Sequence, residues 1–233
     1  MSEPGEPGSR RGRVHDARGA REAILNAAEM VFAEHGFDGA RIDAIAEESG
    51  YNKSLLFQYF GDKLGLYAEV IKRADREMTE FQVRLLAPLL LEDETIASNA
   101  HKFRALLATI VAAIFDYLAA HPRLMRMLLW EQAEGWQTYE KIISQFNTED
   151  NEQIEALFRK AHSTGLLRSD YVPLIQLTIV LQICLSHLTY IPLYRMILPD
   201  EDLSSAAGLA RAREYIVEFV VHGMMTDPKD DET

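Results

Sequence analysis

A segment of eight residues, KSLLFQYF at 53–60, carries polar side chains that could recognise another molecule. At helical spacing Lys53, Ser54 and Gln58 share one side, with Leu55 and Phe57 at its margins. Lysine can donate to guanine, glutamine can pair with adenine through two hydrogen bonds, and leucine can cover a thymine methyl group. The segment therefore has the chemistry to read base edges in the major groove of DNA. The alternative is a short helix whose polar side is simply solvated.

The opposite side of the same segment is apolar. Leu56 and Phe60 are four residues apart, and Tyr51 precedes them by about one helical turn. We expect these three side chains to pack against Ile42 and Ile45 of the preceding segment. Such packing would hold the polar side outward.

The elements around this segment have the signals of a helix-turn-helix. Residues 42–49 form a short run of helical periodicity that Gly50 ends, and Asn52 is suited to cap a helix over 53–59. The Gly-Asp pair that follows makes the next turn and the next cap. Two short helices joined by a four-residue turn that contains glycine predict this motif.

A longer helix is expected on each side of the motif. Residues 17–35 form the first, and Gly36 is suited to end it, with Phe37 folding back on the core. The apolar stripe of this helix comprises Ile24, Ala28, Val31, Phe32 and His35. A second long helix begins at Lys63 and leads towards the rest of the chain.

The N-terminal segment is basic, although the chain as a whole is acidic. Its 36 acidic and 24 basic residues give a net charge of -12, so any contact with a polyanion must be local. The segment 9–21 nevertheless has five arginines and a single acid: Arg10, Arg11, Arg13, Arg18 and Arg21. A basic arm beside a helix-turn-helix can reach phosphates or the minor groove. A tail that only aids solubility is the alternative.

Apolar residues recur at three- and four-residue spacing almost throughout, which predicts an all-α fold of about nine helices. Beyond residue 90 we expect helices over 101–120, 122–134, 137–163, 172–197 and 203–225. They predict a second, larger helical bundle.

The most apolar stretch, 171–198, is long enough to be compared with a membrane span. Polar residues recur through it at Gln176, Gln182, His187 and Arg195. Because such groups are costly in lipid, we expect a helix buried on most sides within protein, and no membrane partner. The single cysteine, Cys184, suits a reducing compartment, and the Gly- and Pro-rich first nine residues do not resemble a secretion signal. The expected location is the cytoplasm.

The segment GFDGARIDAIAEESGYNKSLLFQYFGDKLGLY, 36–67, resembles the DNA-binding signature of the TetR (tetracycline repressor) family. That pattern has Gly-Tyr, a Thr-rich helix start, Ile-Ala, Gly-Val-Ser, Leu-Tyr-x-His-Phe and a Lys. The direct matches are Gly36, Phe37, Ile45, Ala46, Gly50, Leu56, Phe60 and Lys63. Phe57 stands where the family usually has Tyr, and Tyr59 where it often has His.

The resemblance implies a role for each matching position. Lys53, Ser54, Leu55 and Gln58 would face base edges, while Tyr59 and Lys63 would hold phosphates, Lys63 at a helix N-terminus. Arg41 departs from the pattern, because the family commonly has Ser or Thr there and at Ala40. The cap of the second helix is therefore in question, and Arg41 would supply a charged phosphate contact. The implied DNA-contacting set is Arg41, Asn52, Lys53, Ser54, Leu55, Gln58, Tyr59 and Lys63.

The resemblance further implies that the C-terminal part binds a small effector and forms a homodimer. The helices over 172–197 and 203–225 support a dimer independently, because helices this apolar must be buried. A two-fold pairing of them would place two reading helices ~34–36 Å apart on a palindromic operator in double-stranded DNA. A helix buried within a monomer is the alternative.

The implied domains are a disordered basic arm (1–15), a helix-turn-helix DNA-binding domain (16–62), a ligand-binding and dimerisation domain (63–227) and a disordered tail (228–233).

An apolar or aromatic effector is expected, without a cofactor or metal. Candidate contacts are Tyr117, Met127, Trp130, Glu131, Trp136, Tyr139, Gln176 and His187, although each such residue is more often a packing residue or a buried polar group satisfied within the protein. Trp130 and Gln176 are the foremost pair.

Two other functions compete with a ligand-responsive repressor. An enzyme with its active site in the bundle is disfavoured, because the chain has no Gly-x-Ser-x-Gly, no His-Glu-x-x-His, no phosphate-binding loop, and seven histidines without metal-ligand spacing. A helical adaptor for protein partners is the other. Only a DNA-binding protein would bind duplex DNA with a strong dependence on salt.

Overall fold

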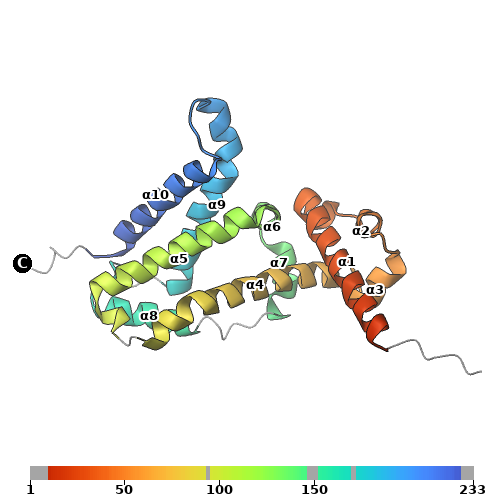
Figure 1. Ribbon diagram of the computed structural model, residues 1–233, viewed down its shortest axis with the longest axis horizontal. Helices are drawn as coiled ribbons and strands as arrows, with labels where there is room; N and C mark the ends of the chain where they lie inside the picture. The colour runs from red at the N-terminus through yellow and green to blue at the C-terminus, as the bar shows by residue number, and fades with distance from the viewer. Residues whose placement is uncertain (1–9, 93–94, 146–151, 169–171, 227–233) are drawn as a thin grey trace, which may run out of the picture. The chain divides into compact units, whose positions relative to one another are not determined.

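The computed structural model describes residues 10–92, 95–145, 152–168 and 172–226, and within them the chain is almost entirely helical (Figure 1). The described part has no strand, only an isolated bridge between Leu167 and Met225, so the predicted all-α fold is confirmed. Its α-helices are α1 (Arg10–Gly39), α2 (Ile42–Ser49), α3 (Lys53–Phe60), α4 (Lys63–Glu92), α5 (Ala100–Ala120), α6 (Pro122–Ala133), α7 (Gln137–Ile142), α8 (Glu152–Ser163), α9 (Pro173–Ile197) and α10 (Ala206–Met224). Two short 3-10 helices, η1 (Ile96–Ser98) and η2 (Ile143–Gln145), complete them.

The chain forms two compact units, and their boundaries differ from the predicted division after residue 62. The first unit combines Met1–Arg76 with Arg126–Gln145, and the second combines Glu77–Met125 with Phe146–Thr233. Most of α6 and all of α7 therefore group with the helix-turn-helix. Contacts between residues far apart in sequence decide this grouping, and the spacing of apolar residues along the chain does not reveal them.

The first unit is built on the predicted apolar faces. Its fully buried side chains include Ile24, Leu25, Phe32, Ile45, Leu56, Leu66 and Tyr67. His35 was expected on the apolar stripe of α1 and is exposed instead. The ring of Phe37 takes the place beneath the last turn, where it stacks on Phe32 with 6.2 Å between centroids and meets Tyr67 edge-on. Gly36 has φ 68° and ψ −179°, which interrupts the helix where a stop was predicted.

Helix α1 begins at Arg10, so residues 10–15 of the predicted disordered arm lie on this helix. Arginine is a good helix former, and no proline follows Pro7 in this segment, although Gly12 and Gly19 each weaken a helix. Residues 1–9 lie outside the described part of the chain, as does the predicted tail over 228–233.

In the second unit α5 is the central helix, and α9 and α10 pack against it and against each other. Helix α8 contacts α9 and η1 at the other side of this bundle. The single helix expected over 137–163 is wrong, since α7 ends at Ile142 and α8 begins at Glu152. The segment SQFNTEDNE between them is rich in polar, turn-favouring residues, which favours two helices over one.

Helix α9 is less buried than its sequence suggests. Val180, Cys184, Leu185 and Leu188 are buried, but large apolar side chains on its other faces are exposed in the single chain. The single chain therefore covers only part of a helix that was expected to be buried on most sides within protein. By length and apolar composition, α5 and α9 could each cross a membrane, a property that core helices of soluble proteins share.

Candidate nucleic-acid interface

Helix α3 presents the predicted polar side. Asn52 precedes it in an extended conformation, and its Oδ1 accepts a hydrogen bond from the Leu55 backbone N–H at 2.9 Å, so the predicted cap is confirmed. Leu56 and Phe60 are buried beneath the helix, as expected. On the other side Lys53, Ser54 and Gln58 are exposed, together with the ring of Phe57. Leu55 is half-buried at the margin.

The turn between α2 and α3 has the predicted backbone. Gly50 ends α2 in the left-handed conformation with φ 74°, and its N–H donates to the Glu47 carbonyl. At the other end of α3, Asp62 Oδ1 accepts from the Gly65 N–H at 2.7 Å and so caps α4. These turns fix the angle at which α3 leaves α2.

The start of α2 has no side-chain cap. Arg41 occupies the cap position with extended backbone and makes no capping hydrogen bond, which agrees with the doubt raised by its departure from Ser or Thr. The uncapped N–H groups of the first turn can donate hydrogen bonds to an anion there, and the exposed Arg41 guanidinium can add a charged contact.

Sequence reasoning did not single out Asp43, which lies in the first turn of α2. Its carboxylate forms an ion pair with Lys53, and Arg41 Nη2 lies 4.0 Å from its second oxygen. The hydrogen bond from Lys53 lowers the pKa of Asp43, so this carboxylate is charged at neutral pH. The signal in the sequence is weak: an acid ten residues before a lysine, across a turn.

The two predicted phosphate contacts differ in their surroundings. Tyr59 is half-buried and meets Phe60 edge-on. Lys63 Nζ donates to the Asp38 carbonyl at 3.2 Å and lies over the ring of Phe37, 4.7 Å from its centroid. Partial burial lowers the pKa of Lys63, opposed by Asp38. An ammonium group has three donors, so Lys63 can bind a phosphate without leaving Asp38.

The arginine-rich arm divides into residues with different roles. Arg18 is exposed, whereas Arg21 pairs with Glu69 of α4 and lies over the ring of Phe60. Arg21 therefore ties α1 to α4 and is not part of a free arm. Arg10, Arg11 and Arg13 lie on the first turns of α1.

Two effector candidates, Glu131 and Tyr139, brace the DNA-binding unit from α6 and α7. Glu131 is 2% exposed, and its carboxylate accepts hydrogen bonds from the Tyr67 hydroxyl at 2.6 Å and from the Tyr139 backbone N–H at 3.1 Å. Burial, and then the hydrogen bond to Glu131, raise the pKa of Tyr67. This link joins residues that are 64 apart in sequence, and no local pattern predicts it.

Trp130 braces the same unit at α1. Its indole Nε1 donates to the Ala33 carbonyl at 3.3 Å, and its ring lies 3.0 Å from where a side chain on Gly36 would begin. Met127 is buried on the same helix. Trp136 has a positive φ of 64° and meets the ring of Tyr139 edge-on.

The remaining effector candidates, Tyr117, Gln176 and His187, lie in the second unit. Tyr117 is buried and stacks on His121 at 4.0 Å, and Gln176 is half-buried near the start of α9. The Nε2 atom of His187 is buried without a hydrogen-bond partner in the described residues, and the centroid of its ring lies 6.1 Å from those of Phe115 and Tyr194. Burial lowers the pKa of His187, so its ring is neutral at pH 7.

Thiol or metal chemistry finds little support in the described residues. Cys184 is fully buried, and burial raises the pKa of its thiol to about 12, so it acts as a small apolar side chain. No group of three or more His, Cys, Asp or Glu side chains in the described part of the chain is arranged to hold a metal ion.

Comparison with known proteins finds a family match for two segments of the chain. Residues 24–70 match the family of bacterial regulatory proteins named after tetR, and residues 104–220 match the tetracyclin repressor-like C-terminal domain. The chain is 33% identical over 121 residues to the HTH-type transcriptional repressor SCO4008 of Streptomyces coelicolor, covering 52% of this chain and 54% of that protein. It is 32% identical over 111 residues to the HTH-type transcriptional activator FasR of Mycolicibacterium smegmatis, covering 48% and 46%. Each match thus spans about half of the curated relative.

Solved structures share the fold. SmeT, the repressor of the Stenotrophomonas maltophilia multidrug efflux pump SmeDEF, superposes with a TM-score of 0.54 at 20% identity over 89% of this chain and 91% of that one. The hemolysin II transcriptional regulator HlyIIR gives 0.56 at 18% over 91% and 99%. At these identities the likeness concerns the fold alone.

The relatives are transcriptional regulators and not enzymes, so the prediction that the chain is not an enzyme is confirmed. Their helix-turn-helix is the DNA-binding element, and residues 24–70 supply it here. With its N-terminal and C-terminal domains both matched, this chain belongs to the TetR family of transcriptional regulators.

Proposed function

We propose that this protein is a cytoplasmic, ligand-responsive repressor, which binds a palindromic operator as a homodimer and is released by a small apolar or aromatic effector. One observation carries the DNA-binding part. An exposed polar side of α3, with Lys53, Ser54 and Gln58, is held outward by the buried Leu56 and Phe60.

The direction of the response rests on the nature of the relatives. SCO4008 is a repressor and FasR an activator, so the family resemblance alone supports either sign. NicS of Pseudomonas putida, 29% identical over 119 residues, is a further repressor, and it covers 51% of each chain. Repression is therefore the better supported assignment.

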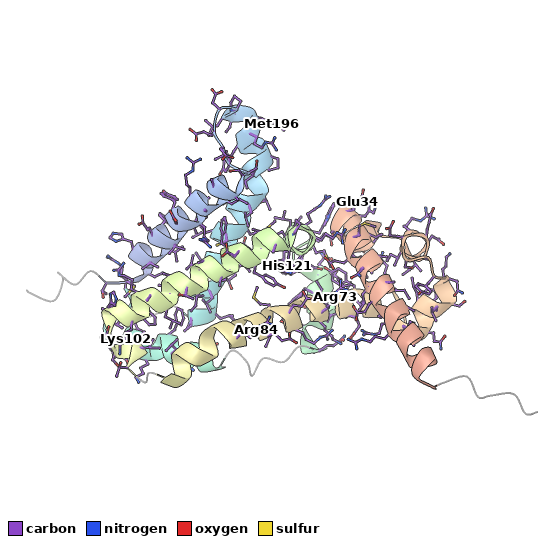
Figure 2. The ribbon with its side chains drawn as sticks, in the orientation of Figure 1. Glu34, Arg73, Arg84, Lys102, His121 and Met196 are labelled. Atoms are coloured by element: carbon purple, nitrogen blue, oxygen red, sulfur yellow. The ribbon has the colours of Figure 1, made fainter. Side chains whose placement is uncertain are left out.

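The dimer is supported by apolar side chains that the single chain leaves uncovered. On α10, Tyr215 and Phe219 stack at 6.4 Å while 69% and 59% exposed. On α9, Ile179 and Ile197 are exposed, and so is Met196, labelled in Figure 2 at the C-terminal end of the helix. Helices α9 and α10 lie in the same unit and pack against each other. Their exposed apolar residues can therefore form a single surface. A second copy of the chain would cover it by two-fold symmetry.

The effector site is proposed in the second unit, near His187. A neutral imidazole with an unpaired, buried nitrogen beside Phe115 suits an aromatic ligand that offers one hydrogen-bonding group. Tyr117 and Gln176 of the original candidates lie in the same unit. Trp130 and Glu131 form hydrogen bonds with residues of α1 and α4. We therefore assign them a structural role in preference to direct contact with the effector.

Selection of bound fragments from random duplex DNA by the purified protein tests the proposed function. A palindromic consensus is the expected result, because each half-site would meet one copy of α3. The double variant Lys53→Ala with Gln58→Ala should then bind this site no better than random DNA, since each lost base contact is worth about 1–3 kcal/mol.

Controls separate a reading defect from a folding defect. The double variant should keep its helical circular dichroism and its oligomeric state, because both side chains are exposed. Glu48→Gln, a change at another exposed position of the same unit, should retain operator selection. Normal operator recognition by the double variant would refute the assignment of α3 as the reading helix.

A further inference from the structure

Asp43 is a carboxylate on the surface that is proposed to approach DNA. It pairs with Lys53 of the reading helix, and Arg41 Nη2 lies 4.0 Å from its other oxygen. Two of the cations assigned to DNA contact thus share one acid. The three side chains are all more than half exposed, so water and a nucleic acid can reach the cluster.

Fold stability does not explain this arrangement. An ion pair between exposed side chains contributes little to stability, because water screens the charges and both side chains lose freedom. The acid also has an electrostatic cost for the proposed function. A negative charge near the phosphates repels them, and the affinity for DNA arises largely from cations that displace counterions.

We propose that Asp43 is a specificity residue: it holds the Lys53 ammonium group over the reading side of α3 and withholds it from phosphates. This inference rests on the proposed function, and it assigns Asp43 a role in sequence discrimination. An unpaired lysine on a flexible stem would bind the nearest phosphate, which is present at every sequence.

The geometry of an ammonium group makes both contacts possible. Lysine has three donors, and the pair with Asp43 uses one, so two remain for the acceptors on a guanine edge. On random DNA, in contrast, the paired lysine and aspartate together carry no net charge. The pair then adds little to the sequence-independent attraction, while Arg41 and Lys63 still meet the phosphates.

The test compares binding of a random-sequence duplex and of the selected duplex across salt concentrations, for the wild type and Asp43→Asn. Asparagine keeps the size of the side chain and removes its charge. The variant should bind random DNA more tightly, because Lys53 gains a phosphate contact. Its salt slope should steepen by about 0.9, which makes the loss of affinity between about 50 and 200 mM salt roughly threefold larger. The ratio of selected to random affinity should fall.

Three further variants separate the role of Asp43 from a general effect of charge. In a Lys53→Ala background, Asp43→Asn should change the salt slope far less, because the lysine it restrains is gone. Asp43→Glu should keep the wild-type slope, since a longer carboxylate can still reach Lys53. Glu48→Gln removes one negative charge from α2 at an exposed position and should leave the slope unchanged. Thermal unfolding of each variant should match the wild type.

The proposal is overturned if Asp43→Asn leaves random-DNA binding unchanged, if its effect persists without Lys53, or if Glu48→Gln has the same effect. Each of these results leaves DNA binding by the wild type intact, and therefore leaves the proposed function standing. A wild type that shows no salt-dependent binding to duplex DNA would overturn the proposed function itself, and the role of Asp43 with it.

Discussion

The buried carboxylate of Glu131 organises the side chains that support the DNA-binding unit. It has two donors, the Tyr67 hydroxyl and the Tyr139 backbone N–H, and it is almost completely removed from water. A charged group in such a place is costly unless hydrogen bonds compensate for the lost water. Both donors are therefore needed for the stability of the unit.

Removing one donor gives a direct test at this scale. Tyr67→Phe keeps the ring that meets Phe32 and Phe37 and leaves one oxygen of Glu131 without its partner. The free energy of unfolding should fall by about 1–3 kcal/mol, measured by urea denaturation. Tyr51→Phe, at a half-buried ring in the same unit, should change it by less than about 0.5 kcal/mol. Equal effects of the two changes would contradict the role given to Glu131.

At the scale of elements, the start of α3 has to serve both stability and recognition. Asn52 caps the helix through Leu55, and it also belongs to the set predicted to contact DNA. A cap satisfies one of the backbone N–H groups that every helix leaves open. The two roles can be separated by the charge of the replacement.

Asn52→Ala should lower the free energy of unfolding by about 1 kcal/mol, because the capping oxygen is lost. Asn52→Asp should keep the stability, since aspartate caps as well as asparagine, but should weaken DNA binding through repulsion of phosphates. Ser54→Ala, at an exposed position inside the helix, is the matched control for stability. Urea denaturation and DNA titration of the three variants check both parts. Full DNA affinity in Asn52→Asp would place residue 52 away from the phosphates.

Local chemistry explains which elements the sequence could predict. Gly50, Asn52 and the Gly61-Asp62 pair act on their own neighbours, so the turns and caps around α3 follow from residue types alone. The same holds for the side of α3 that Leu56 and Phe60 bury. Helix bounds in the longer segments were less accurate, since α1 starts before the expected Ala17 and the 137–163 segment divides into two helices.

Contacts between distant segments could not be predicted in this way. The bond from Tyr67 to Glu131 and the packing of Trp130 on Gly36 depend on how α6 meets α1 and α4. From the sequence alone, Trp130 and Glu131 of α6 were predicted to contact the effector. Asp43 was overlooked for a similar reason, because its pairing with Lys53 arises only after the turn folds.

For the whole molecule, the uncovered apolar side chains of α9 and α10 matter most. Aromatic side chains at the centre of an interface commonly contribute most of its affinity. Tyr215 and Phe219 are the largest such pair on α10, and their rings already stack in the single chain. This arrangement would spare part of the ordering cost when a second copy binds.

Replacing Phe219 by glutamate should therefore weaken the proposed dimer by at least about 2 kcal/mol, or roughly thirtyfold in the dissociation constant. Analytical ultracentrifugation over a range of concentrations measures this change. Glu214→Gln, an exposed position five residues before Phe219 on α10, is the control and should leave the dimer intact. A Phe219→Glu protein that stays dimeric at the lowest concentrations would show that the two copies meet elsewhere.

Gly36 places two independent demands on one position. Its positive φ excludes most side chains, and a first side-chain carbon there would lie only 3.0 Å from the Trp130 ring. Even asparagine, which tolerates the αL region, does not suit φ 68° with ψ −179°, and shrinking residue 130 relieves the crowding but not the torsion. A smaller residue at 130 would thus restore the stability of a Gly36→Ala protein only in part. A genetic search for suppressor mutations would find no single second substitution that restores it fully.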